Sequence, residues 1–202
     1  MVWMSRVDLR EITRRLLVAA ARDRFQQHGY VETRVQDIAS DAGYTRGAFY
    51  ANFEDKGDIF LAVLEADRGS RLATIDRLGD PGTADPIAAA LAWIDDTFVH
   101  DPLLRARAEF GLTVADHAHH RPRLTAIVET QLTAIEHVIE AACAHQGVRL
   151  QWPAGHLARL VACLLGGYAD HRQIDENLVP PELIASGLTA LWTAATVSDA
   201  TD

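Results

Sequence analysis

Apolar residues recur at helical spacing through most of this 202-residue chain, and no segment alternates apolar and polar residues as a half-buried strand would. Glycines and prolines divide the pattern into pieces, as expected at helix ends and helix starts. The spacing therefore predicts an all-α protein of about nine helices. The expected ranges are 8–28, 35–42, 46–52, 56–78, 86–99, 102–119, 122–145, 154–172 and 181–196.

The second and third expected helices have only about two turns each, which is too short for a helix to persist alone. The turn between them contains Gly43, which suits a positive φ, and Thr45, which suits an N-cap. Leu17, Ala21 and Phe25 form one apolar stripe on the first helix that could hold both. This pattern predicts a helix-turn-helix, whose third helix enters a DNA major groove.

The outer face of that third helix carries side chains suited to DNA. Arg46 can donate paired hydrogen bonds to guanine or phosphate, Tyr50 can donate its hydroxyl to phosphate, and Gly47 and Ala48 allow close approach. Lys56, the only lysine, begins the fourth helix, where the helix dipole disfavours a cation unless an anion binds nearby. Thr33 is expected to N-cap the second helix. The expected DNA-contacting residues are Thr33, Arg34, Thr45, Arg46, Gly47, Ala48, Tyr50 and Lys56.

The segment from about Arg14 to Leu64 resembles the TetR/AcrR family of transcriptional regulators. The matching residues are Leu17, Ala20-Ala21, Phe25, Gly29-Tyr30, Thr33, Val35, Ile38-Ala39, Ala42-Gly43, Thr45, Gly47, Phe49-Tyr50, Phe53 and Lys56. The resemblance implies a DNA-binding domain at 1–55 and a helical ligand-binding and dimerisation domain at 56–202. It also implies a homodimeric repressor that binds a pseudo-palindromic operator and is released by a small molecule.

Four residues depart from the pattern usual in that family: Arg24, Ala48, Asn52 and Gly57. Ala48 and Asn52 leave the operator sequence open. Gly57 is expected to weaken the first turn of the fourth helix by about 1 kcal/mol relative to alanine.

The formal charge differs between the two parts of the chain. The whole chain has 19 basic and 28 acidic residues, a net charge of −9 that by itself argues against nucleic acid. Residues 1–56, however, hold nine basic and eight acidic side chains, whereas residues 57–202 hold ten and twenty. This division favours two parts with different partners, and it places the DNA-binding task in the first.

Two expected helices in the acidic part carry apolar stripes that polar residues interrupt. One interpretation is core packing with polar residues at the rim. The other is a largely apolar ligand pocket with a few orienting polar groups. Under the second interpretation, which the family resemblance favours, the pocket residues are Trp93, Phe98, Arg107, Phe110, Val114, His117 and Gln131.

The last two expected helices are apolar around much of their circumference, and small residues such as Gly166-Gly167 allow close helix packing. We expect two copies of the chain to form a four-helix dimer interface here. A monomer that buries both faces internally is the alternative. The expected interface residues are Leu157, Val161, Leu164, Gly167, Tyr168, Leu183, Ile184, Leu188, Leu191 and Trp192.

Other classes of site are not favoured. The chain lacks the short motifs of common hydrolases and phosphate-binding loops, so no enzyme and no cofactor are predicted. His117, His119 and His120 lack a further ligand nearby in sequence, so no metal site is predicted. Two cysteines, no signal peptide and no membrane-length apolar stretch favour the cytoplasm. A helical scaffold without DNA binding remains the alternative function.

Overall fold

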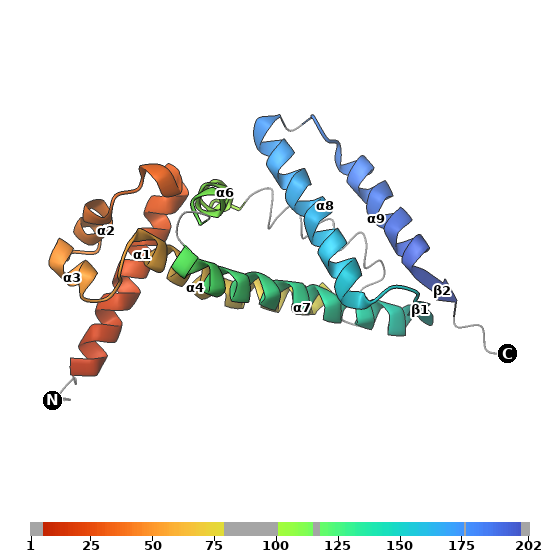
Figure 1. The fold of residues 1–202 in the computed structure, drawn as a ribbon, viewed down its shortest axis with the longest axis horizontal. Coiled ribbons are helices and arrows are strands. Elements are labelled where there is room, and N and C mark those ends of the chain that lie inside the picture. The colour runs from red at the N-terminus through yellow and green to blue at the C-terminus, as the bar shows by residue number, and fades with distance from the viewer. Residues whose placement is uncertain (1–5, 79–100, 115–117, 176, 199–202) are drawn as a thin grey trace. The chain divides into compact units, whose positions relative to one another are not determined.

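The computed structural model describes residues 6–78, 101–114, 118–175 and 177–198. Contacts between Cα atoms divide the chain into two compact units (Figure 1). The first unit comprises residues 1–68 and 102–127, and the second comprises residues 69–101 and 128–202. The elements are α1 (Arg6–Glu32), α2 (Val35–Asp41), α3 (Arg46–Tyr50), α4 (Lys56–Leu78), α6 (Leu104–Thr113), the 3-10 turn η2 (Ala118–His120), α7 (Arg121–Gln146), β1 (Val148–Leu150), α8 (Ala154–Ile174), α9 (Pro181–Ala195) and β2 (Thr196–Ser198).

The first unit is organised around the apolar stripe of α1. Leu17, Ala21 and Phe25 are completely buried, as their i, i+4 spacing predicts. The short helices α2 and α3 add Ile38 and Phe49 to the same core, and both side chains are also fully buried. Burial of these large apolar groups compensates for the low intrinsic stability of two such short helices.

Aromatic rings join α1, α4 and α6 within the first unit. Phe60 of α4 lies edge-on to Phe25 at a centroid distance of 4.8 Å, and Phe110 of α6 lies edge-on to Tyr30 at 5.0 Å. Phe60 and Phe110 are themselves 4.9 Å apart. Edge-to-face pairs at these distances are favourable beyond the area that they bury. This aromatic cluster fixes α6 against the end of α1.

Most of the expected helices are present, although several bounds differ. The helix expected over 46–52 ends at Tyr50, and the one expected over 102–119 is replaced by the shorter α6 followed by η2. Helix α1 continues to Glu32, but Gly29 has a left-handed φ of 74° and interrupts the helical conformation. The helix expected over 86–99 lies outside the described residues.

The second unit contains a small sheet that the sequence did not predict. Strands β1 and β2 pair antiparallel, with Val148 opposite Ser198 and Leu150 opposite Thr196. Three residues per strand are too few to give a recognisable alternation of apolar and polar residues. The strands follow α7 and α9, whose residues Ile139 and Ala195 pack with α8 in one buried cluster.

Among the residues that the structure describes, no helix is both long enough and apolar enough to cross a membrane.

Candidate nucleic-acid interface

The turn between α2 and α3 has the geometry that its sequence predicts. Gly43 has a φ of 76°, and the backbone N–H of Tyr44 donates to the carbonyl of Ala39 at 2.8 Å. Thr45 is extended, and its hydroxyl oxygen accepts a hydrogen bond from the backbone N–H of Ala48 at 3.2 Å. The left-handed Gly43 ends α2 and the Thr45 N-cap begins α3, so both local predictions are confirmed.

Helix α3 presents one buried and one exposed side. Phe49 is fully buried and anchors the helix, while Arg46, Gly47 and Tyr50 are exposed. The Arg46 guanidinium lies 5.4 Å from the centre of the Tyr50 ring, and its Nη2 donates to the Tyr50 hydroxyl at 3.4 Å. The exposed side therefore carries the planar guanidinium of Arg46 and the phenol of Tyr50 beside Gly47, which has no side chain. Such groups can reach base edges and phosphates.

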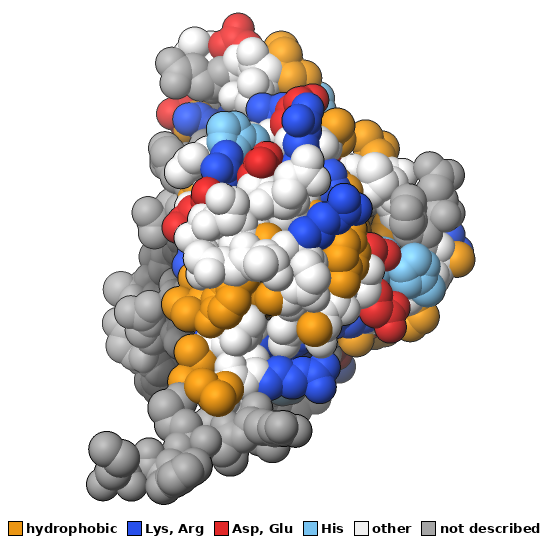
Figure 2. Space-filling model, turned by 90° about the vertical axis from the view of Figure 1, so that its left-hand side faces the viewer, with side chains coloured by type: hydrophobic (Ala, Val, Ile, Leu, Met, Phe, Trp, Pro, Cys, Tyr) orange, Lys and Arg blue, Asp and Glu red, His pale blue; other side chains and the backbone are white. Residues whose placement is uncertain are grey.

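The surface on this side of the molecule is mixed in character (Figure 2). Lys and Arg side chains are spread among neutral and hydrophobic ones and do not form a single dense patch. This agrees with the small excess of one positive charge in residues 1–56.

Thr33 does not cap α2, so that prediction is wrong. The N-cap position belongs to Arg34, whose side chain makes no capping hydrogen bond and is exposed. Thr33 is only 2% exposed, and its hydroxyl donates to the carbonyl of Gly29 at 2.6 Å. The left-handed conformation of Gly29 breaks the helical hydrogen-bond series there, so nearby carbonyls accept from other donors.

Lys56 supplies another of those donors. Its Nζ donates to the carbonyls of Tyr30 at 2.7 Å, Val31 at 3.1 Å and Thr33 at 3.0 Å, and it lies 4.5 Å from the centre of the Tyr30 ring. Burial lowers the pKa of Lys56, while the carboxylates of Glu109 and Glu32 oppose that shift. An ammonium has three N–H donors, and each has a carbonyl acceptor here. The positive N-terminal end of the α4 dipole disfavours the Lys56 ammonium there, and the carbonyls at the end of α1 compensate for this.

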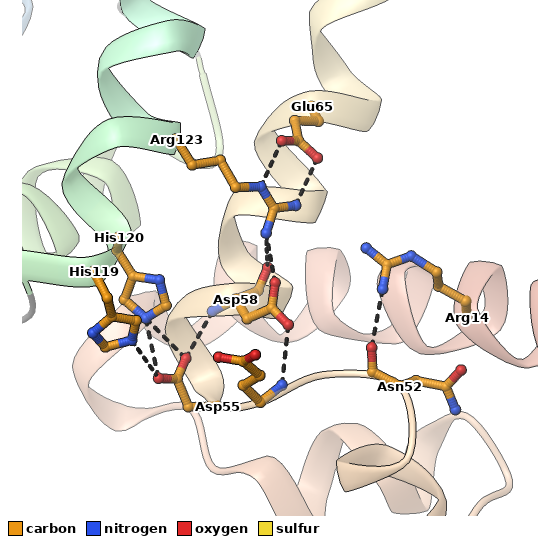
Figure 3. Close-up of polar contacts among 9 residues, drawn as sticks. Arg14, Asn52, Asp55, Asp58, Glu65, His119, His120 and Arg123 are labelled. Atoms are coloured by element: carbon orange, nitrogen blue, oxygen red, sulfur yellow. Dashed lines mark hydrogen bonds and ion pairs between the residues drawn. The ribbon is translucent and has the colours of Figure 1, made fainter.

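Further contacts hold α2 and α3 against α1. Arg14 donates to the carbonyl of Asn52 at 3.0 Å and Arg10 to that of Ala51 at 3.0 Å, both just after α3 (Figure 3 shows the Arg14 contact). At the other helix, Arg24 forms a two-bond ion pair with Asp41, with Nη2 2.9 Å from Oδ1. Arg24 therefore has a defined role in place of the usual aliphatic residue. Sequence patterns gave no signal for Arg10 or Arg14, because their acceptors are distant backbone carbonyls.

Three of the expected pocket residues, Arg107, Phe110 and Val114, lie in the described part of the first unit. Phe110 is 1% exposed within the aromatic cluster, and Val114 packs against the same core. Arg107 lies 3.6 Å from Asp67, which Arg22 also approaches at 2.8 Å. Gln131 belongs to the second unit, and Trp93, Phe98 and His117 lie outside the described residues. For Phe110 the geometry fits the alternative interpretation of core packing.

The expected dimer residues divide into two groups. Leu157, Tyr168, Ile184 and Leu188 are buried within the chain itself, so they cannot form the outer surface. Val161, Leu164, Gly167, Leu191 and Trp192 are partly exposed. The strongly exposed large apolar side chains of α8 and α9 are Leu160, at 47%, Ile174, at 79%, and Leu183, at 59%. Of these three, only Leu183 is among the expected interface residues, because exposure depends on how α8 and α9 pack together.

The similarity of this chain to known proteins is highest in the helix-turn-helix region. Residues 17–63 match the sequence model described as bacterial regulatory proteins, tetR family. The probable acrEF/envCD operon repressor of Escherichia coli is 46% identical over 48 residues, which are 24% of this chain and 22% of the relative.

Weaker similarity extends over most of the chain. The HTH-type transcriptional repressor BepR of Brucella suis is 24% identical over 166 residues, covering 77% of this chain and 78% of the relative. The structure of SmeT, the repressor of the Stenotrophomonas maltophilia multidrug efflux pump SmeDEF, matches with a TM-score of 0.64 and 21% identity, covering 94% of this chain and 93% of SmeT. A SmeT–triclosan complex matches with a TM-score of 0.65 and 23% identity, covering 93% of each chain. At these identities the structural matches establish the fold.

Proposed function

The chain belongs, through residues 17–63, to the tetR family of bacterial regulatory proteins, and we propose that it binds operator DNA through α3 and regulates transcription. The observation that carries this proposal is the exposed side of α3, which offers Arg46, Gly47 and Tyr50 while Phe49 anchors the helix. Arg34, Thr45 and Ala48 are further candidates for contact with DNA. Arg46 is the candidate for reading a base, since a guanidinium matches the two acceptors of guanine.

Repression and release by a small molecule are parts of the same proposal. BepR is described as a transcriptional repressor, and SmeT is a repressor whose structure has also been solved in complex with triclosan. By analogy, a small and largely apolar effector would bind this chain and lower its affinity for DNA. The candidate contacts remain Trp93, Phe98, Arg107, Phe110, Val114, His117 and Gln131. The effector must bind the two conformations with different affinities, because otherwise it shifts no equilibrium.

A homodimer completes the proposal. The exposed Leu160 and Leu183, with the partly exposed Leu164 and Gly167, give α8 and α9 an outer surface of apolar and small residues. Two copies joined there would place two α3 helices on one duplex. The operator would then be pseudo-palindromic, with half-sites about 34–36 Å apart or a multiple of that spacing. Its place of action would be the cytoplasm.

Fluorescence anisotropy with duplexes from the DNA that flanks the gene tests the DNA-binding proposal. We expect sequence-specific binding that Arg46→Ala weakens by about 1–3 kcal/mol, with relaxed preference at one base pair in each half-site. Arg15→Ala is the matched control, because Arg15 is exposed on α1 and pairs only with Glu11, at 3.0 Å, in the described contacts. A folded protein that binds no duplex specifically would support the helical scaffold instead.

A further inference from the structure

Three metal-ligating side chains converge at a point that the proposed DNA contacts do not use. Asp55 directly precedes α4, and His119 and His120 form the end of η2. One ligand atom from each residue lies within 4.8 Å of the other two. Figure 3 shows both imidazole rings directed at the same carboxylate. His119 and His120 are 64 and 65 positions from Asp55 in the sequence. The sequence near the histidines therefore gives no sign of this carboxylate.

The distances suit a small divalent cation. Oδ2 of Asp55 lies 3.2 Å from Nε2 of His119 and 3.1 Å from Nε2 of His120. Zinc binds imidazole nitrogen and carboxylate oxygen at about 2.0–2.2 Å, so neighbouring ligand atoms in a tetrahedral site are about 3.3 Å apart. Each imidazole nitrogen is thus close to the spacing from the Asp55 oxygen that a shared cation requires, and the two nitrogens lie within 4.8 Å of each other. Two imidazoles and one carboxylate are also a ligand set that d-block cations prefer over Mg²⁺ or Ca²⁺.

The surroundings hold two of the three ligands in place. His120 is 5% exposed and lies over the position of Gly57, where any side chain would overlap its ring. Oδ1 of Asp55 accepts a hydrogen bond from the backbone N–H of Asp58 at 2.8 Å, which leaves further lone pairs for a cation. Oriented ligands of this kind raise metal affinity. His119, by contrast, is 55% exposed, so water can reach the remaining coordination position.

We infer that Asp55, His119 and His120 bind one divalent d-block cation, with Zn²⁺ as the representative, and that water completes its coordination. The bound cation would join the segment before α4 to the turn before α7. Arg123, at the start of α7, already contacts Asp58 and Glu65 of α4 beside this point (Figure 3). The cation would add a second connection between the same two segments.

Untagged protein, freed of metal by a chelator that is then removed, tests the inference without any DNA. Titration with Zn²⁺ against a chromophoric chelator should give one site per chain. Co²⁺ should give the visible absorption of a nitrogen- and oxygen-ligated ion, and Zn²⁺ should raise the thermal midpoint. His119→Gln and Asp55→Asn should each weaken Zn²⁺ binding by about ten-fold or more and abolish the rise. Asparagine preserves the capping oxygen at position 55, and His119 is exposed, so both variants should fold.

His137→Gln is the matched control, because His137 is an exposed histidine of α7 outside the cluster. It should bind Zn²⁺ as the unaltered protein does. Unchanged affinity in the double variant Asp55→Asn/His119→Gln, or an equal loss in His137→Gln, would overturn the inference. So would the absence of any stoichiometric binding. Because the readouts are metal affinity and stability, the inference can fail while the DNA-binding proposal stands.

Discussion

Gly57 and His120 are packed so closely that a β-carbon added to Gly57 would overlap Nε2 of His120 and lie 2.7 Å from its Cδ2. The sequence alone indicated only a cost for glycine in the first turn of α4. The structure gives the reason for that glycine, since His120 occupies the space that a side chain at position 57 would take. The relationship connects two segments that are far apart in the chain.

Replacing Gly57 by alanine should therefore destabilise the protein. Overpacking costs about 1–3 kcal/mol, of which the better helix propensity of alanine returns up to about 1 kcal/mol. Urea unfolding at equilibrium measures the difference. The control is Gly111→Ala, because Gly111 is an exposed glycine of α6 and an added β-carbon would have no neighbour within 4 Å. That variant should gain stability, and a Gly57→Ala protein that gains as much would contradict the packing argument.

Lys56 has two possible roles, and Lys56→Gln separates them. Loss of the ammonium leaves the carbonyls of Tyr30, Val31 and Thr33 short of donors, so we expect stability to fall by about 1–3 kcal/mol. A lysine occupied in this way should not change the slope of log K against log salt for DNA binding. A phosphate contact predicts instead that the slope falls by about 1 per subunit, with equal weakening on all sequences. Urea unfolding and salt titrations on two different duplexes give both readouts.

The sequence predictions were mostly correct where the interactions join residues close in sequence and failed where they join distant ones. Gly43 and Thr45 were predicted correctly because their conformation depends on hydrogen bonds within a few residues. The prediction that Thr33 caps α2 was wrong because Gly29, four residues earlier, interrupts the helical conformation. The carbonyl of Gly29 then accepts the hydrogen bond of the Thr33 hydroxyl. The position of Asp55 beside His119 depends on the packing of whole helices. No periodicity or local spacing encodes such a contact.

Phe110 distinguishes the core interpretation of α6 from the pocket interpretation. Its ring lies within about 5 Å of Tyr30 and Phe60, and the side chain is 1% exposed. Phe110→Ala should lower the free energy of unfolding by about 3–5 kcal/mol, as for other large aromatic residues removed from a core. Gln131→Ala should leave stability nearly unchanged, since Gln131 is partly exposed. A stable Phe110→Ala protein with an altered effector response would instead favour the pocket.

Leu183 tests the proposed dimer surface. It is 59% exposed on α9, so a charge there should cost little in a monomer but should be unfavourable if a partner covers it. Leu183→Glu is expected to convert a dimer to folded monomers in sedimentation velocity experiments. Leu112→Glu is the control, because Leu112 is 80% exposed on α6 in the first unit. Equal dissociation of both variants, or an unaltered protein that is already monomeric, would contradict the assignment of α8 and α9.

Tyr30 should make the protein sensitive to alkali. Burial, together with the nearby charge of Asp55, raises the pKa of Tyr30 to about 12, whereas the phenol of an unfolded chain has a pKa near 10. The folded state therefore keeps the proton that the unfolded state loses, so this stabilisation is complete below pH 10 and is lost as the pH rises towards 12. At pH 11 the loss should be about 1.4 kcal/mol.

Tyr30→Phe removes the ionisable phenol while it keeps the aromatic ring, so the variant should lose less stability than the unaltered protein between pH 8 and pH 11. Urea unfolding at both pH values gives the difference, and other titrating groups cancel in the comparison. If Tyr30→Phe and the unaltered protein lose equal stability at pH 11, the Tyr30 hydroxyl is not desolvated in the folded state.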